Sequence, residues 1–260
     1  MAELVSGDFS GLSSAYSKNR PDYSKSVLNA LLGLYSIERR NLRAADIGAG
    51  TGIWTRMLHD AGVDKVLAVE PNDDMRNQGE EDNNGRSIEW IKGSAELTGL
   101  SNSSFDLVSM ASSFHWANFE LATKEFHRIL SPGGRFVAIW NPRLIEVNPL
   151  LVQIEDYLKE LKSDLKRVSS GRSGMTETLT EKLTASKFFD DVVYVEGRHE
   201  IEMTRDRYIG AWRSVNDLQV QLGPKAFGQF MSYIEQVTSD SETITATYLT
   251  RAWSALKFTD

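Results

Sequence analysis

The sequence predicts an α/β fold: a Rossmann-like, doubly wound sheet of seven strands, mostly parallel, with a helical lid inserted after the fifth strand. Three observations predict it. Short apolar runs alternate with amphipathic segments between residues 42 and 140, a glycine-rich loop follows the first run, and the alternation ends at Asn141-Pro142. Such an alternation requires right-handed crossovers and a parallel sheet that is covered on both faces.

Each expected element follows from its own local pattern. Residues 22–37 are predicted to be a helix, because their valine and leucines recur at helical spacing after Pro21. The predicted strands are short runs rich in apolar and β-branched residues: residues 42–47, 65–69, 88–91, 105–110, 135–140, 192–196, 199–203 and 243–256. The other predicted helices are residues 53–61, 73–78, 119–130, 148–166, 205–214 and 225–237, and a loop is expected over residues 169–178.

These elements are assigned to one domain of residues 1–260, a length that suits a single sizeable core. The division within it rests on the change of pattern after the fifth strand. Its predicted parts are N-terminal cap helices (1–41), a cofactor-binding core (42–140), a lid that faces the substrate (141–190 and 204–238) and closing strands (191–203 and 243–257).

Composition narrows the class of protein. Lys and Arg total 29 and Asp and Glu total 36, so the net charge of −7 argues against nucleic acid or an anionic membrane as a partner. No apolar run approaches the roughly 20 residues that span a bilayer, and no secretory signal is visible, so a cytoplasmic location is expected. The chain has no cysteine, and no His, Asp or Glu cluster has the spacing of metal ligands, so no metal site is expected.

The clearest chemical signal is the loop Asp46-Ile47-Gly48-Ala49-Gly50-Thr51-Gly52, between the first predicted strand and the next helix. Glycines adopt backbone angles that other residues avoid, and they let a ligand approach the main chain. Glu70 ends the second strand, 18 positions past Gly52, near the spacing at which a carboxylate accepts hydrogen bonds from ribose hydroxyls. Both features fall at the carboxyl ends of adjacent strands, so they predict a site for an adenosine-containing cofactor.

The glycine spacing helps to identify the nucleotide. A dinucleotide fold spaces its glycines G-x-G-x-x-G and places a pyrophosphate at the helix start, whereas this loop reads G-x-G-x-G after an aspartate. A carboxylate at the mouth of the loop repels a pyrophosphate and attracts an ammonium, which favours S-adenosylmethionine over NAD. Two alternatives stay open: an NAD(P)-dependent oxidoreductase, and a catalytically silent adenosyl-binding partner protein.

With its downstream motifs the chain resembles the class I S-adenosylmethionine-dependent methyltransferases, in particular the small-molecule group that includes the trans-aconitate and ubiquinone/menaquinone methyltransferases. The matching motifs are Asp46 to Gly52, Glu70-Pro71, Gly93-Ser94-Ala95-Glu96, Ser104 to Val108 and Glu125 to Gly134. The resemblance implies transfer of a methyl group from S-adenosylmethionine to a small-molecule acceptor, with S-adenosylhomocysteine as the product. O-methylation is favoured over N-methylation, and the sequence defines neither the acceptor nor the oligomeric state.

By the same resemblance, the cofactor contacts fall on particular positions. Glu70 would hold the ribose hydroxyls, and Ser94, where family members usually have Asp, would meet the adenine edge. The full expected set is Asp46, Gly48, Ala49, Gly50, Glu70, Asn72, Met75, Ser94, Ala95 and Arg20. Arg20 belongs to the segment from Tyr16 to Tyr23, which resembles a Tyr…Arg-Pro-x-Tyr element that folds over the cofactor in this group. A plain helix start with two partly buried tyrosines is the alternative.

The expected acceptor pocket contains Tyr16, Tyr23, His115, Trp116 and Trp212. His115 is the best candidate for a general base, because its unperturbed pKa near 6.5 suits proton abstraction. The preferred interpretation is that His115 and Trp116 form the pocket wall, since methyl transfer needs mainly positioning when the acceptor has no proton to lose. Arginines of the lid, such as Arg143, predict an anionic acceptor.

Overall fold

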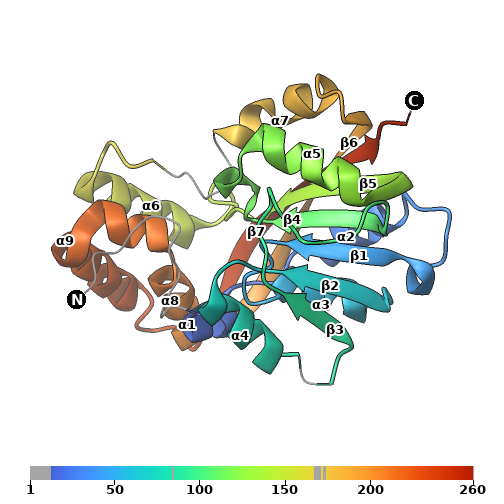
Figure 1. Ribbon diagram of the computed structural model, residues 1–260. Helices are drawn as coiled ribbons and strands as arrows, with labels where there is room; N and C mark the ends of the chain where they lie inside the picture. The colour runs from blue at the N-terminus through green and yellow to red at the C-terminus, as the bar shows by residue number, and fades with distance from the viewer. Residues whose placement is uncertain (1–12, 84, 167–170, 172–173, 260) are drawn as a thin grey trace.

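Seven strands form one mixed sheet in the computed structural model, which describes residues 13–83, 85–166, 171 and 174–259 (Figure 1). The predicted N-terminal cap and the predicted loop over 169–178 therefore lie partly outside the described residues. The strands are β1 (Arg43–Ile47), β2 (Lys65–Val69), β3 (Ile88–Ile91), β4 (Phe105–Ala111), β5 (Leu130–Trp140), β6 (Phe189–Thr204) and β7 (Thr243–Lys257).

The strands lie in the order β3-β2-β1-β4-β5-β7-β6. The first five are parallel, and β7 pairs antiparallel with β5 and β6, which confirms the predicted doubly wound α/β fold. One expectation is wrong: residues 192–196 and 199–203 are not two strands but parts of β6. Gly197 continues the strand between them. A Cβ there would lie 2.8 Å from Val27 Cγ2, so glycine permits the close packing of a helix on this strand.

Helices cover both faces of the sheet (Figure 1). The helical elements are α1 (Ser13–Asn19), α2 (Lys25–Leu32), η1 (Arg39–Asn41), α3 (Ile53–Asp60), α4 (Asp73–Glu81), η2 (Phe114–Trp116), α5 (Phe119–Ile129), α6 (Pro149–Leu161), α7 (Met175–Thr184), α8 (Arg205–Arg213) and α9 (Asn216–Val237). α5 and α7 pack on one face through Phe126 and Leu179. α2 and α3 pack on the other face through Leu31 and Trp54. The glycine-rich loop between β1 and α3 is thereby fixed at both of its ends.

A separate cluster of helices forms beyond the carboxyl ends of the parallel strands. β6 and β7 run past β5 as a long antiparallel pair, and α6, α8 and α9 pack on this extension, on the left of Figure 1. Trp212 of α8 and Phe230 of α9 are fully buried in its core. Most of the predicted lid therefore packs together. The exception is α7, which lies within the predicted lid segment 141–190 but packs against the main sheet through Leu179.

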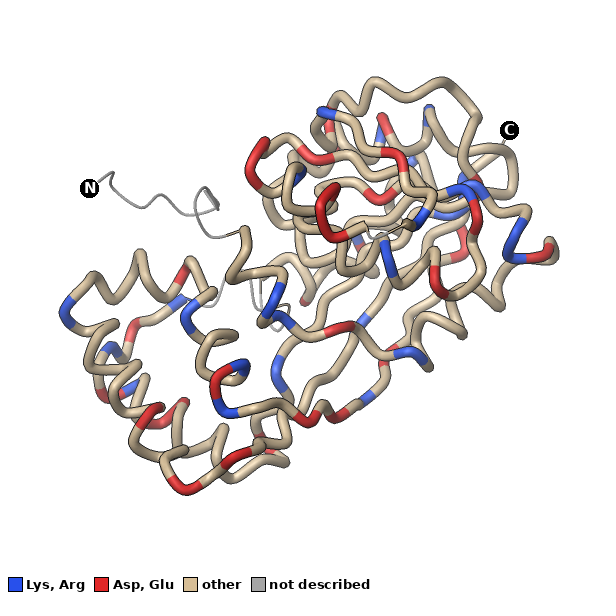
Figure 2. The backbone as a smooth tube through the Cα atoms, turned by 90° about the horizontal axis from the view of Figure 1, so that it is seen from below, with Lys and Arg blue, Asp and Glu red and all other residues tan. Residues whose placement is uncertain are grey.

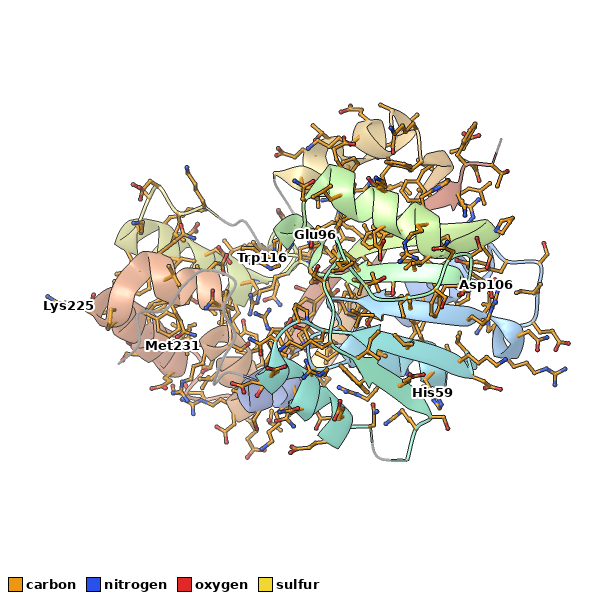
Figure 3. The ribbon with its side chains drawn as sticks, in the orientation of Figure 1. His59, Glu96, Asp106, Trp116, Lys225 and Met231 are labelled. Atoms are coloured by element: carbon orange, nitrogen blue, oxygen red, sulfur yellow. The ribbon has the colours of Figure 1, made fainter. Side chains whose placement is uncertain are left out.

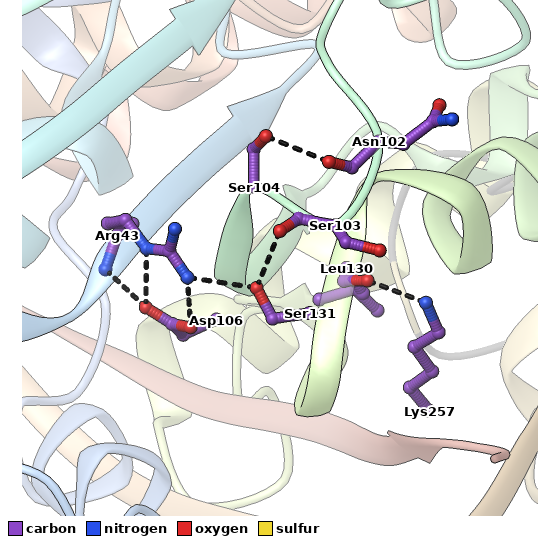
Figure 4. Close-up of polar contacts among 8 residues, drawn as sticks. All are labelled: Arg43, Asn102, Ser103, Ser104, Asp106, Leu130, Ser131 and Lys257. Atoms are coloured by element: carbon purple, nitrogen blue, oxygen red, sulfur yellow. Dashed lines mark hydrogen bonds and ion pairs between the residues drawn. The ribbon is translucent and has the colours of Figure 1, made fainter.

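A polar network joins the strands at the opposite, amino-terminal edge of the sheet (Figure 4). Asp106 accepts hydrogen bonds from Arg43 Nε at 3.1 Å, Nη2 at 2.9 Å and the backbone N at 3.0 Å. Arg43 Nη2 also donates to Ser131 Oγ at 2.9 Å, and this hydroxyl donates to Ser103 O at 3.1 Å. Bidentate ion pairs with further hydrogen bonds are the stronger kind, so the network holds the starts of β1, β4 and β5 together.

Charged residues are distributed over both the sheet and the helical lid (Figure 2). Basic and acidic positions are interspersed along the backbone, and the net charge of the chain is −7. Within the described ranges, no helix combines the length and the apolar character that crossing a membrane requires.

Candidate active site

A cavity of about 250 Å³ opens at the carboxyl ends of β1, β2 and β4, where open α/β sheets place their ligands. We refer to it as the loop cavity, because the glycine-rich loop forms part of its wall. Most of the predicted cofactor-binding residues line it: Gly48, Ala49, Gly50, Glu70, Asn72, Met75, Ser94 and Ala95. Two predicted cofactor-binding residues, Asp46 and Arg20, do not line it.

The glycines of the loop are required by its shape. Gly48, Gly50 and Gly52 have φ angles of +63°, +58° and +79°, in the left-handed region that favours glycine. The backbone N–H of Gly48 donates to Val69 O at 2.8 Å and holds the loop against the end of β2. A Cβ on Gly48 would lie 2.9 Å from Ser113 Oγ. The first glycine therefore also permits the close approach of the segment after β4.

Glu70, which follows β2, is held in place by the backbone. Its Oε2 accepts a hydrogen bond from Gly50 N at 2.8 Å, and its Oε1 accepts one from Asn72 N at 2.9 Å. Burial raises the pKa of Glu70, and these two hydrogen bonds oppose that effect by favouring the ionised form. Each carboxylate oxygen has two lone-pair sites, so Glu70 retains acceptor capacity toward a ligand in the loop cavity.

Asp46 does not lie where the sequence interpretation requires it. Its side chain is fully buried, and its carboxylate accepts hydrogen bonds from Thr55 Oγ1 at 2.6 Å and Ser109 Oγ at 3.0 Å. Burial raises the pKa of Asp46 to about 7, against the effect of both hydroxyl donors. Asp46, which was predicted to meet the cofactor at the mouth of the loop, is absent from the described wall of the cavity. Its hydrogen bonds instead fasten β1 to α3 and β4.

Glu96 is a lining carboxylate that the sequence interpretation missed. It follows Ser94 and Ala95 in the motif expected at the adenine edge, and its Oε1 accepts a hydrogen bond from Asn118 N at 2.8 Å. Burial works against ionisation of Glu96, but its backbone hydrogen bonds and the Ser94 hydroxyl together lower its pKa. The signal was present in the sequence, because this carboxylate stands two positions after the serine that replaces the usual Asp.

Apolar side chains and a helix cap complete the wall of the loop cavity. The side-chain oxygen of Asn72 accepts a hydrogen bond from Met75 N at 3.0 Å and thereby caps α4. Met75 is 3% exposed, and with Ala95 and Met110 it gives the cavity an apolar surface. Apolar walls with a few placed polar groups are typical of small-molecule sites, and this one suits a planar aromatic ring.

The charges around the loop cavity are all of one sign. Among the described residues that line it, Glu70 and Glu96 are the charged ones, and none is a lysine, arginine or histidine. Such a wall attracts a cation and repels a pyrophosphate. The negative charge on this wall therefore comes from Glu70 and Glu96 and not from Asp46.

A second cavity, of about 100 Å³, adjoins the first. We refer to it as the lid cavity, because residues of the α8–α9 connection and of α9 help to line it. Five residues line both cavities: Tyr16, Tyr23, Ile53, Ser112 and Trp116. The charged residues in the described lining of the lid cavity are Arg20, Arg143 and Asp217. The two adjoining cavities therefore differ in the sign of their charge.

A hydroxyl pair lies where the cavities meet. Tyr23 Oη and Ser112 Oγ are 2.9 Å apart, and burial raises the pKa of Tyr23, so its hydroxyl stays protonated. Ser112 has a φ of +54° although it is not glycine, a strained conformation of the kind that clusters at functional sites. Trp116 is 42% exposed and lies between the sheet and the lid helices (Figure 3).

Arg20, which was predicted to contact the cofactor, lines the lid cavity rather than the loop cavity. Its Nη2 donates to Ser214 O at 3.1 Å, and its guanidinium lies 4.8 Å from the centroid of the Tyr16 ring. The Nε of Arg20 is buried and has no hydrogen-bond partner among the described residues. The segment from Tyr16 to Tyr23 thus borders both cavities.

Trp212, which was predicted to lie in the acceptor pocket, lines neither cavity. It is fully buried in the lid, where its ring meets that of Phe230 edge-on with 5.4 Å between centroids. The guanidinium of Arg143 lies 3.6 Å from the centroid of the Trp212 ring, a cation–π contact. Trp212 therefore packs against Arg143, which lines the lid cavity.

His115 also lies outside the residues that line the two cavities. Its Nδ1 accepts a hydrogen bond from Trp140 Nε1 at 3.3 Å, which places the proton of the neutral ring on Nε2. Burial lowers the pKa of His115 to about 4, against the opposing effect of the Asp217 carboxylate. A neutral ring whose acceptor nitrogen is already occupied argues against the general-base role. Of the predicted pair His115 and Trp116, only Trp116 is among the residues that line the cavities.

The other histidines take part in contacts elsewhere. His59 on α3 lies well apart from Trp116 (Figure 3). His127 Nε2 and His199 Nε2 lie 3.0 Å and 3.1 Å from the carbonyl oxygens of Phe258 and Asp22. In the part of the chain that the structure describes, no group of three or more His, Cys, Asp or Glu side chains is arranged to hold a metal ion.

Known proteins share this sequence pattern. Residues 45–138 match the family described as a methyltransferase domain. An uncharacterised methyltransferase of Mycobacterium tuberculosis is 33% identical over 142 residues, which are 54% of each chain. The ubiquinone/menaquinone biosynthesis C-methyltransferase of Rubrivivax gelatinosus is 31% identical over 96 residues, which are 36% of this chain and 37% of that protein. The chain thus spans about half the length, or less, of these curated relatives.

Solved structures share the fold. A protein of Anaeromyxobacter dehalogenans assigned as a type II methyltransferase has a TM-score of 0.67 at 20% identity, over 91% of this chain and 97% of that one. A phosphoethanolamine N-methyltransferase of Haemonchus contortus, solved with S-adenosylhomocysteine, has a TM-score of 0.54 at 16% identity, over 95% of this chain and 57% of that one. At these identities the likeness is one of fold.

Proposed function

We propose that this chain, whose residues 45–138 match a methyltransferase-domain family, is a class I S-adenosylmethionine-dependent methyltransferase that transfers a methyl group from S-adenosylmethionine to a small-molecule acceptor. The loop cavity is proposed to hold the cofactor, and the lid cavity the acceptor. The observation that carries the proposal is the charge of the two walls. The loop cavity has two carboxylates and no basic side chain in its described lining, whereas the adjoining lid cavity has two guanidinium groups and one carboxylate.

The residues of the loop cavity fit S-adenosylmethionine. When bound, this cofactor supplies a sulfonium methyl group that is already activated toward a nucleophile. Its net positive charge suits a wall that carries only carboxylates. Glu70 is placed to accept the ribose hydroxyls, and the backbone of Gly48 and Gly50 to receive the methionine part. Met75 and Ala95 offer an apolar surface to the adenine ring.

The acceptor's reacting atom is proposed to lie where the cavities meet, beside Tyr23 and Ser112, whose hydroxyls orient it. No histidine lines either cavity in the described part of the chain. A site without such a base suits an oxygen that is ionised at neutral pH, such as a carboxylate. The new C–O bond then forms as the C–S bond breaks, with its electron pair left on sulfur, and no proton is removed. O-methylation of an anionic acceptor is therefore favoured over N-methylation, and Arg20 and Arg143 are placed to bind the anion.

Calorimetric titration tests the assignment of the cofactor. S-adenosylmethionine and S-adenosylhomocysteine are expected to bind, and NAD is not, because its pyrophosphate faces Glu70 and Glu96. Glu70→Gln is expected to weaken S-adenosylhomocysteine binding by about 10- to 100-fold, since an amide nitrogen then faces one of the two backbone N–H donors.

Glu89→Gln serves as the control, because Glu89 is an exposed carboxylate on β3 outside the lining of both cavities. This variant is expected to bind S-adenosylhomocysteine as the wild type does. Tight binding of NAD without binding of S-adenosylmethionine would instead assign the chain to the oxidoreductases. Cofactor binding without methyl transfer to any acid offered would favour a catalytically silent adenosyl-binding partner protein.

A further inference from the structure

Asp217, near the start of α9, is a buried carboxylate without a hydrogen-bond partner. It lines the lid cavity and is 4% exposed, and neither of its carboxylate oxygens accepts a hydrogen bond from any residue that the structure describes. Buried polar groups are normally satisfied, and an unpaired buried carboxylate costs free energy. A buried carboxylate on a cavity wall is therefore suited to accept hydrogen bonds from a ligand that binds in the cavity.

The same cavity presents cations. Arg20 and Arg143 line it together with Asp217, and Arg20 Nε is likewise buried without a partner. The remaining contacts of these arginines fix their positions, through Ser214 O for Arg20 and the Trp212 ring for Arg143. A molecule in the lid cavity therefore meets groups of both charges on one wall.

These three charged residues are set back from the cofactor. They line the lid cavity but not the loop cavity, whereas Tyr23 and Ser112 line both. They are therefore placed against a part of the acceptor that does not react. This position suits Asp217 to recognition of the acceptor rather than to removal of a proton at the reacting atom.

We propose that the acceptor is zwitterionic: a small dicarboxylic acid that also carries a protonated amine. One carboxylate reacts beside Tyr23 and Ser112. The ammonium is bound by Asp217 and the second carboxylate by Arg20 and Arg143. The inference rests on the proposed methyl transfer and adds the class of the acceptor to it. An ammonium offers three donors, enough for both Asp217 oxygens. An acceptor with negative charge alone would leave Asp217 unpaired and be repelled by it.

Matched pairs of acids test this proposal. Glutamate and glutarate differ by one amino group, as do aspartate and succinate. With S-adenosylhomocysteine bound, the wild type is expected to bind the amino-bearing member of each pair about tenfold more tightly or better in calorimetry. Transfer of labelled methyl from S-adenosylmethionine is expected to follow the same order. Asp217→Asn is expected to abolish this preference, mainly by weakening the binding of the amino acids.

The control for this variant is Glu235→Gln, on the same helix, because Glu235 pairs with Arg213 outside the lid cavity. It is expected to keep the wild-type preference. Asp217→Asn should keep the wild-type affinity for S-adenosylhomocysteine, since Asp217 does not line the loop cavity. Equal binding of paired acids by the wild type, or an unchanged preference in Asp217→Asn, overturns the zwitterion proposal. Failure of the wild type to bind S-adenosylmethionine removes the methyltransferase proposal itself.

Discussion

Carboxylates of one chemical type occupy three environments in this site. Asp46 is fully buried and accepts hydrogen bonds from two hydroxyls. Glu70 and Glu96 lie on the wall of the loop cavity and accept hydrogen bonds from backbone N–H groups. Asp217 is buried on the wall of the lid cavity and has no partner. Burial and hydrogen bonding determine what each carboxylate can do: Asp46 is enclosed by hydroxyls of the fold, whereas the other three lie on cavity walls.

Asp46 is expected to make stability depend on pH. Burial raises its pKa to about 7, so the folded protein binds more protons than the unfolded chain between about pH 4 and about pH 7. The free energy of unfolding therefore falls as the pH rises through this window, by up to about 4 kcal/mol from this group. Urea unfolding of the wild type and of Asp46→Asn across the window measures this component, which the variant should lack.

A matched control separates this effect from the loss of a charge. Asp64→Asn removes an exposed carboxylate between α3 and β2, and it should leave the pH dependence as in the wild type. If the unfolding free energies of the wild type and Asp46→Asn change in parallel between about pH 4 and about pH 7, the linkage to Asp46 is wrong.

The sequence did not predict which single carboxylates are buried. The loop motif identified Asp46 and Glu70, but the hydroxyls that enclose Asp46 come from α3 and β4, and no local pattern shows that they turn its carboxylate away from the cavity. Asp217 gave no signal, because an aspartate near the start of a helix is ordinary. Its burial depends on the packing of α9 beside residues far away in the chain.

At the scale of elements, the packing of α4 against β3 depends on one glycine. A Cβ on Gly79 would lie 2.1 Å from Trp90 Cη2. Alanine in place of a helical glycine ordinarily adds about 1 kcal/mol of stability, but Gly79→Ala is expected to lower the free energy of unfolding by about 1–3 kcal/mol through overpacking. Urea unfolding measures the difference.

Gly228 on α9 provides the comparison, because a Cβ there would meet nothing within 4 Å. Gly228→Ala is expected to raise the free energy of unfolding by about 0.5–1 kcal/mol. The two substitutions are chemically identical, so opposite changes in the free energy of unfolding would isolate the effect of the contact with Trp90. A gain of similar size in both variants would refute the packing argument.

Elements with strong local patterns were predictable, and those defined by distant contacts were not. The five parallel strands follow from short apolar runs and the turns that bound them. Two strands were predicted within residues 192–203 because a glycine such as Gly197 usually interrupts a strand. In the structure Gly197 continues β6, because its missing side chain leaves room for Val27 of α2. α7 was assigned to the lid because it follows the fifth strand in the sequence. In the structure its Leu179 packs in the core on the main sheet.

At the scale of the whole molecule, α1 connects the sheet region to the lid. α1 contacts both α4 and α8, and Tyr16 on α1 lines both cavities. A Cβ on Gly210 of α8 would lie 2.5 Å from Asn19 Cγ. Gly210→Leu is therefore expected to displace α1 and to weaken S-adenosylhomocysteine binding by about tenfold, as measured by calorimetry.

The control for this variant lies on the same helix. Asp206 is exposed on α8, so Asp206→Leu adds the same side chain without touching α1. It is expected to bind S-adenosylhomocysteine like the wild type. Equal affinities of Gly210→Leu and the wild type would mean that the contact between α1 and α8 does not shape the loop cavity.

The polar network of Arg43, Asp106 and Ser131 lies at the edge of the sheet that is opposite the two cavities. It joins β1, β4 and β5 at their starts, whereas both cavities open near the other ends of the strands. Substitutions around the lid cavity leave this network and the glycine-rich loop intact. Descendants of one ancestral chain can therefore change which molecule fits the lid cavity by mutation of a few lid residues, while they inherit the glycine-rich loop and the polar network unchanged.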